Sequence, residues 1–198
     1  MKRIAIAGGI GAGKTVVTNR LRDLGFEVVD ADVVAHGVTA RGTPAWQALR
    51  DAFGDAVLAA DGSLDHHFVA DVVFHDPSAL RRLNSITHAR IGIEIIRQLD
   101  RATGEVVFLA IPLFRSEHRA AFSLDETWAV LATPDTSLRR LAQERGFKEG
   151  DAQARMANQM SNEERASIVN RVIWNEGTLV ELFEQLDEVL RESSLVRG

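Results

Sequence analysis

The sequence predicts an α/β protein built on a five-stranded parallel sheet with flanking helices. Three observations lead to this fold class. Short apolar runs alternate with longer amphipathic stretches along the 198 residues, as in repeated strand–helix–strand units. The first apolar run leads directly into a glycine-rich loop. Glycine or proline then marks the ends of several later stretches, which fixes the approximate limits of the elements.

Five short apolar runs are expected to form the strands. They cover residues 3–7, 26–29, 106–111, 127–132 and 169–174. The run 106–111 is the most apolar and is stopped by Pro112, so we expect it to be a buried inner strand.

The helices are expected where apolar residues recur at helical spacing. They cover residues 14–24, 44–53 and about 77–99, then 135–145 and a final helix from about 179. A short helix is also expected within 66–75, whereas the polar segment 146–167 is expected to form a mobile flap. The three tryptophans, Trp46, Trp128 and Trp174, are expected in the core.

Composition limits the classes of protein that fit. A hydrophobic content of 45% and a charged content of 26% are ordinary for one compact domain with insertions. The net charge of −5 argues against a nucleic-acid partner, because phosphate backbones favour basic surfaces. The absence of cysteine excludes disulfides and thiolate chemistry. No apolar run is long enough to span a membrane and no signal peptide precedes the first strand, so we expect a cytoplasmic protein.

The glycine-rich loop is the most specific motif of the chain. It reads G-G-I-G-A-G-K-T and fits G-x-x-x-x-G-K-[ST], a loop whose backbone N–H groups surround nucleotide phosphates. The predicted phosphate-binding residues are Gly8, Gly9, Ile10, Gly11, Ala12, Gly13, Lys14 and Thr15. Lys14 is expected to reach the β- and γ-phosphates, and the Thr15 hydroxyl is expected to coordinate Mg²⁺. Lys14 is also one of only three lysines in the chain.

Other features separate the classes of phosphate-loop protein. The N-K-x-D motif that reads guanine is absent, and the run 106–111 contains no acid that would serve a motor ATPase. Asp30 and Asp32 instead lie at the end of the second strand, where the crevice of a parallel sheet binds its ligands. A carboxylate at that place can accept the proton of an attacking hydroxyl. The alternative is that both acids are helix caps or solvated loop residues.

Arginines are concentrated around the polar segment 146–167. Arg139, Arg140 and Arg145 lie on the predicted helix before it, and Arg155 and Arg165 lie within it. Arginines can stabilise the charge on a phosphoryl group during transfer, and a lid that closes over ATP would exclude water. The alternative is a solvated, charged helix face.

Several motifs together resemble one family. They are the phosphate loop, L-G-F-E-V-V-D-A-D-V-V-A-H from Leu24 to His36, I-T-H at 86–88, I-P-L at 111–113, R-L at 140–141, R-G at 145–146, Arg155 with Gln159, and V-I-x-N-x-G at 172–177. Over nearly its whole length, the chain resembles the dephospho-CoA kinase family.

The resemblance implies a P-loop kinase fold and a specific reaction. Residues 1–198 would form one kinase domain, with a helical substrate-binding insertion at 34–103 and a lid at 146–167. The implied reaction is ATP-dependent phosphorylation of the ribose 3′-hydroxyl of dephospho-CoA, with Mg²⁺, to give coenzyme A and ADP.

The resemblance also implies roles for individual residues. Asp32 would be the general base. Lys14, Arg140 and Arg145 would stabilise the transferring phosphoryl group, and Asn175 would lie near the adenine of ATP.

His36 and His88 are candidates for binding the acceptor. Each is equally compatible with a packed or capping histidine. Oligomeric state is not predicted by the sequence.

Four departures from the family pattern concern the acceptor side. They are His66, Ala89, Ala110 and Arg115. Two further functions therefore remain open: a related kinase for another nucleoside-like or nucleotide-like acceptor, and a nucleotide-binding regulator without catalysis.

Overall fold

The computed structural model describes residues 1–65, 69, 72 and 76–195, except for the side chains of Glu144 and Arg145. The chain divides into two compact units. Unit 1 comprises Met1–Asp30 and Ala102–Gly198, and unit 2 comprises Ala31–Arg101. The short helix expected within 66–75 and the departure at His66 lie outside the described residues.

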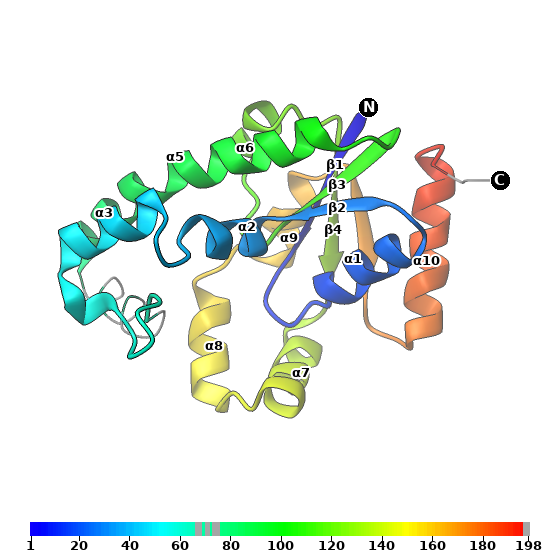
Figure 1. Ribbon diagram of the computed structural model, residues 1–198. Coiled ribbons are helices and arrows are strands. Elements are labelled where there is room, and N and C mark those ends of the chain that lie inside the picture. The colour runs from blue at the N-terminus through cyan, green and yellow to red at the C-terminus, as the bar shows by residue number, and fades with distance from the viewer. Residues whose placement is uncertain (66–68, 70–71, 73–75, 196–198) are drawn as a thin grey trace. The chain divides into compact units, whose positions relative to one another are not determined.

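Unit 1 contains a five-stranded parallel sheet, which confirms the predicted fold class (Figure 1). The strands are β1 (Lys2–Gly8), β2 (Glu27–Asp30), β3 (Val106–Ile111), β4 (Glu126–Leu131) and β5 (Arg171–Trp174). Their order in the sheet is β2-β3-β1-β4-β5. As expected, β3 is an inner strand, and all six of its residues are buried.

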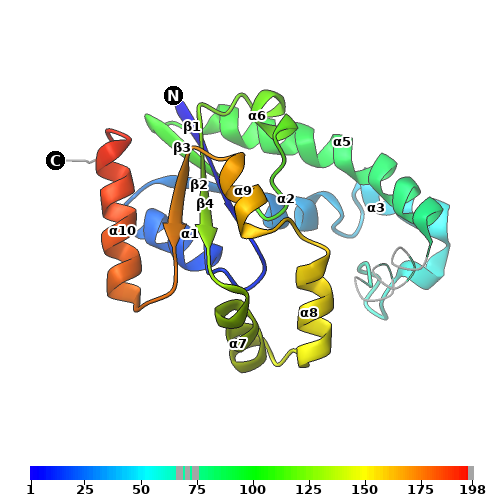
Figure 2. The same ribbon diagram turned by 180° about the vertical axis from the view of Figure 1, so that it is seen from behind.

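The helices of unit 1 flank this sheet. They are α1 (Lys14–Asp23), α6 (Glu117–Ala121), α7 (Pro134–Arg145), α8 (Glu149–Ala157), α9 (Asn162–Ser167) and α10 (Leu179–Glu192). In both views α1 and α10 lie side by side (Figures 1 and 2). Their apolar faces meet the sheet in one core that includes Leu21, Phe108, Trp128 and Leu186. Because β1 and α1 both pack into this core, the two ends of the glycine-rich loop are fixed in position.

Two helices occupy the segment that was expected to be a flap. α8 packs beside α7 and α9 lies against β4. A capping box begins α9, because the Ser161 side chain accepts a hydrogen bond from the Glu164 backbone and the Glu164 side chain accepts one from the Ser161 backbone. Such caps satisfy backbone donors that a helix start leaves free.

Unit 2 is helical in its described part. It contains α2 (Ala31–Val38), α3 (Pro44–Phe53), a 3₁₀ turn η1 (Asp55–Val57) and α5 (Pro77–Arg101). Both α2 and α3 pack against α5. A small apolar cluster of Leu49, Val57 and Leu64 forms its core, with Trp46 packed at the edge. The sequence did not predict α2, because β-branched residues and Gly37 weaken its helix propensity.

The prediction that all three tryptophans lie in the core is wrong for Trp174. Trp128 is fully buried, whereas the Trp174 side chain is 45% exposed. Successive side chains of a strand point to opposite faces, and on the edge strand β5 the buried position belongs to Ile173. In an edge strand, an apolar run therefore does not mean that every side chain of the run is buried.

A buried carboxylate, Glu126, joins several elements of unit 1. It forms an ion pair with Lys2 at 2.8 Å and accepts hydrogen bonds from Arg171 and from the Trp128 indole. The Ser193 hydroxyl also donates to it. Burial opposes the negative charge, but the hydrogen bonds from these donors outweigh it and lower the pKa of Glu126 to about 2. This carboxylate thus links β1, β4, β5 and the end of α10.

None of the helices in the described part of the chain is long and apolar enough to cross a membrane.

Candidate active site

The glycine-rich loop connects β1 to α1 at the carboxyl edge of the sheet. Gly11 and Gly13 have φ angles of 76° and 93°, values that only glycine adopts readily. The Ala12 N–H donates to the Gly9 carbonyl at 3.2 Å, which closes the turn. The helix then begins at Lys14. The backbone of the loop and the positive end of the α1 dipole therefore meet at one place, as anion binding requires.

Neighbouring elements press closely against the loop at these two glycines. A Cβ atom on Gly11 would lie 2.8 Å from the Ser137 carbonyl oxygen of α7. A Cβ atom on Gly13 would overlap the Asn175 amide nitrogen. Both positions therefore need glycine for space as well as for backbone angle.

We expect Gly13→Ala to lower the free energy of unfolding by about 2 kcal/mol. About half of this comes from the left-handed backbone and half from the displaced Asn175 hydrogen bond. Gly146→Ala is the matched control, because Gly146 has a φ of 64° and a Cβ atom there meets nothing within 4 Å. Urea unfolding of both variants checks this expectation, and equal losses would contradict the proposed contact with Asn175.

Asn175 bridges the loop and α7. It is 5% exposed. Its amide nitrogen donates to the Ala12 carbonyl at 2.9 Å, and its amide oxygen accepts from Arg140 at 3.2 Å. Another guanidinium nitrogen of Arg140, Nη1, is buried without a hydrogen-bond partner in the described structure. The predicted Asn175 and Arg140 thus lie together beside the phosphate loop.

Glu176 adds a contact that the sequence analysis missed. Its carboxylate accepts hydrogen bonds from the Thr133 backbone and hydroxyl and from the Thr136 hydroxyl. Burial raises its pKa, but these hydrogen bonds and the charge of Arg140 outweigh burial, so the pKa is lowered overall. An ionised Glu176 therefore fixes the first turn of α7, the helix that carries Arg140. Its position beside Asn175 in the chain was the only available signal.

The other predicted residues are distributed over both units. Lys14 is half-buried and Thr15 is exposed, both in the first turn of α1. Arg145 ends α7, and its side chain lies outside the described part. Asp32 lies in the first turn of α2, two residues after β2 ends at Asp30.

The acceptor-side candidates lie in unit 2. Asp32 and His36 are both exposed on α2 and are four residues apart, a spacing that places them on one helix face. His88 is exposed on α5, the helix against which α2 packs. The structure therefore brings together two neighbouring helices that carry all three side chains.

The chain between α8 and α9 is tied to the phosphate loop. The Gln159 side-chain oxygen accepts a hydrogen bond from the Ile10 N–H at 3.0 Å. The Asn162 side chain donates to the Ala132 carbonyl at the end of β4 at 2.8 Å. Arg165 lies in the same region and is only 2% exposed. The segment 146–167 thus contacts the phosphate loop through the Gln159 side chain, and the sequence did not predict that Ile10 is its partner.

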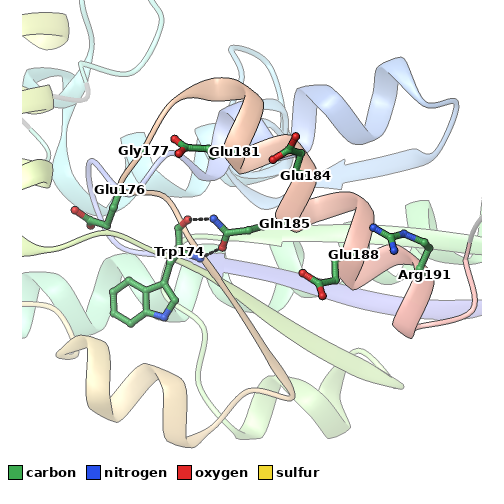
Figure 3. Close-up of a pocket in the computed structure, with 8 residues that line it drawn as sticks. All are labelled: Trp174, Glu176, Gly177, Glu181, Glu184, Gln185, Glu188 and Arg191. Carbon is green, nitrogen blue, oxygen red and sulfur yellow. Dashed lines mark hydrogen bonds between the residues drawn. The ribbon is translucent and has the colours of Figure 1, made fainter.

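A different hollow in unit 1 has the wrong charge for phosphate. This groove of about 790 Å³ lies along α10 and the end of β5. Figure 3 shows Glu176, Glu181, Glu184 and Glu188 around it, with the Trp174 backbone held by Gln185. Four carboxylates beside one arginine would repel a triphosphate. The phosphate loop, and not this groove, is therefore the candidate nucleotide site.

A phosphate loop between the central parallel strand and α1, with an arginine-bearing helix packed against it, defines the class of P-loop kinases. The sequence profile of the family described as dephospho-CoA kinase matches residues 2–181. The chain belongs to the dephospho-CoA kinase family.

Individual relatives agree with this assignment. A dephospho-CoA kinase of Streptomyces avermitilis is 41% identical over 191 residues, which cover 96% of this chain and 92% of the relative. The crystal structure of TT1252 from Thermus thermophilus superposes with a TM-score of 0.82 at 32% identity, covering 100% of this chain and 98% of that one. A dephospho-CoA kinase structure from Campylobacter jejuni has a TM-score of 0.65 at 23% identity and covers 96% of both chains. This last likeness concerns the fold alone.

Proposed function

We propose that this protein transfers the terminal phosphoryl group of ATP to the ribose 3′-hydroxyl of dephospho-CoA. The products are coenzyme A and ADP. The observation that carries the proposal is the family match over residues 2–181, which includes the phosphate loop and the acid that follows β2. The intact Lys14 and Asp32 argue against a regulator without catalysis.

The donor side of the reaction is assigned to unit 1. The loop of residues 8–15 holds the phosphates through backbone N–H groups other than those of Ile10 and Ala12, which donate within the protein. Lys14 neutralises charge on the β- and γ-phosphoryl oxygens. Arg140 and Arg145 stabilise the charge that develops during transfer. The Arg140 nitrogen that is buried and has no partner among the described residues supports this role, because a buried cationic donor favours an anionic acceptor. Asn175 is assigned to the adenine side of the site.

Asp32 is assigned the proton transfer. Its carboxylate accepts the proton of the ribose hydroxyl as the hydroxyl oxygen attacks the γ-phosphorus atom. The bond from that phosphorus atom to the β–γ bridging oxygen breaks, and ADP leaves. His36 and His88 are assigned to acceptor binding, residues 34–103 to the acceptor subdomain and residues 146–167 to a lid.

Magnesium fits the donor site in the way that kinases use it. Among the described residues, no three histidine or acidic side chains gather to hold a metal ion. Mg²⁺ in such enzymes keeps few protein ligands and binds largely through substrate phosphates and water. The exposed Thr15 hydroxyl at the start of α1 is the residue that would hold it. The bound ion would neutralise phosphate charge during transfer.

The test compares phosphoryl acceptors. ATP consumption is measured with dephospho-CoA and, separately, with a panel of nucleosides and nucleotides. We expect turnover with dephospho-CoA to exceed that with every other acceptor. Turnover only with another acceptor would establish the related-kinase alternative, and ATP binding without turnover on any acceptor would establish the regulator. A cytoplasmic location stays a prediction of the sequence and is tested by cell fractionation.

A further inference from the structure

Arg165 is a buried cation that has no carboxylate partner among the described residues. Its side chain lies in α9 and is 2% exposed. One terminal nitrogen, Nη2, donates to the Met160 carbonyl at 3.2 Å, while Nε is buried without any partner in the described structure. Burial lowers the pKa of Arg165, and no carboxylate within the described ranges raises it. Within the described part of the chain, one neutral hydrogen bond therefore holds the guanidinium group.

Such an arrangement is costly for the folded protein. Buried charges are normally paired, because removal of a cation from water is compensated only by an opposite charge and by hydrogen bonds. One carbonyl oxygen satisfies only one of the five N–H donors of arginine. The position thus has the properties of a site that is completed by an anionic ligand.

The guanidinium group lies against the phosphate loop. A Cβ atom on Gly9 would be 3.6 Å from Nη2 of Arg165 and 3.4 Å from the Gln159 side-chain oxygen. That oxygen is the one that accepts the Ile10 N–H. Arg165 and Gln159 therefore both lie against the first half of the loop, at Gly9.

Two hollows meet at this side chain. One, of about 440 Å³, is lined by Gly9, Ile10 and Ser137. The other, of about 390 Å³, is lined by Phe114 and Arg115 after β3. Arg165, Gln159 and Met160 line both. The side chain of this buried cation thus forms part of the wall of both hollows, one along the phosphate loop and one past the end of β3.

Acidic side chains near the hollows do not neutralise Arg165. Glu163 and Glu164 line the first hollow. The Glu164 carboxylate accepts the Ser161 N–H at 2.8 Å as part of the α9 cap, and Glu163 is exposed. Glu117 lines the second hollow together with Arg115. Neither hollow contains a carboxylate that pairs with the buried guanidinium group in the described structure.

We propose that Arg165 is an anion-binding residue of this kinase, and that its guanidinium group binds a phosphoryl oxygen of the substrate beside Gly9 and Ile10. The terminal phosphoryl group of ATP is the ligand that the position against the loop favours. The diphosphate of the acceptor carries phosphoryl oxygens of the same kind, and it would reach Arg165 through the hollow that Arg115 lines. The identity of these substrates rests on the proposed function.

The test uses the full chain and the variant Arg165→Met, which keeps the length of the side chain and removes the charge. Dissociation constants for ATP, ADP and dephospho-CoA are measured separately by calorimetry, so that no turnover occurs. We expect the Kd for ATP to rise about 10- to 100-fold, as for a lost charged hydrogen bond, and the Kd for ADP to change by less than about threefold. The melting temperature of the ligand-free variant should not fall, because a costly buried charge is removed.

Two further variants complete the experiment. Arg165→Lys keeps the charge and is expected to recover part of the ATP affinity, and it replaces Arg165→Met if that variant does not fold. Arg22→Met is the matched control, because Arg22 is exposed on α1 and its Nη1 donates to the neutral side chain of Asn19. It should leave all three dissociation constants unchanged.

Each outcome decides the proposal. A loss confined to ATP, or one confined to dephospho-CoA, supports it and identifies the source of the phosphoryl group. Unchanged dissociation constants for all three ligands, or a lower melting temperature with equal losses for ATP and ADP, would overturn it in favour of a structural role. The proposed function is overturned by a different result, namely that the wild-type protein does not turn over dephospho-CoA. In that case the comparison of the Kd values for ATP and ADP still tests the role of Arg165.

Discussion

Asp32→Asn is expected to lower kcat for phosphoryl transfer to dephospho-CoA by about 10²–10⁴-fold, the usual contribution of a general base. Asparagine has nearly the same shape but accepts no proton from the attacking hydroxyl. The Kd for ATP should change by less than about threefold, because Asp32 is assigned to the acceptor and not to the phosphate loop. Steady-state kinetics and calorimetry with ATP provide the two readouts.

Asp51→Asn is the matched control for this experiment. Asp51 is an exposed aspartate of α3 in the same unit, and its carboxylate accepts a hydrogen bond from Gln47. We expect wild-type kcat for this variant. If Asp32→Asn keeps near-normal turnover, Asp32 is not the base and the assignment of the D-A-D segment is wrong.

Glu126→Gln is expected to lower the free energy of unfolding at pH 7 by about 3 kcal/mol. The Glu126 pKa falls from 4.5 to about 2 in the folded protein, and this difference corresponds to that energy. Since the folded pKa is the lower one, the stabilisation is fully present above pH 4.5 and is lost as the pH falls through about 2. The difference between wild type and variant should therefore shrink over this range. Urea unfolding measured at a series of pH values checks both the size and the direction.

Glu192→Gln provides the control for the stability experiment. Glu192 also pairs with Arg171, but its side chain is 55% exposed, and exposed ion pairs contribute at most about 1 kcal/mol. We expect a smaller loss with little dependence on pH. A pH-independent difference between wild type and Glu126→Gln would show that the lost stability is not linked to ionisation of this carboxylate.

The sheet and the phosphate loop were predictable because their signals are local. Buried parallel strands are short apolar runs, and the loop requires glycine, lysine and a hydroxyl at fixed spacing. The five-stranded parallel sheet is confirmed. Strand limits moved by one or two residues, as at β5, which was expected from 169 and begins at Arg171.

The contacts around the loop were not predictable, because they join distant parts of the chain. The hydrogen bond from Ile10 to Gln159 spans 149 residues, and that from Asn175 to Ala12 spans 163. No spacing rule relates such positions. The polar residues of the segment 146–167 gave no signal for the two short helices α8 and α9, which are stabilised by packing and by the Ser161 cap. Polarity alone therefore did not distinguish a helix from a loop.

The contact between Gly13 and Asn175 has a consequence for how this protein can change during evolution. The amide occupies the space that any side chain at position 13 would need, and the same amide binds the carbonyl of Ala12 and the guanidinium group of Arg140. A larger residue at position 13 is therefore compatible only with a smaller one at position 175, whose loss would in turn leave Arg140 without this acceptor. The three positions form an epistatic set, in which the effect of each substitution depends on the residues present at the other two.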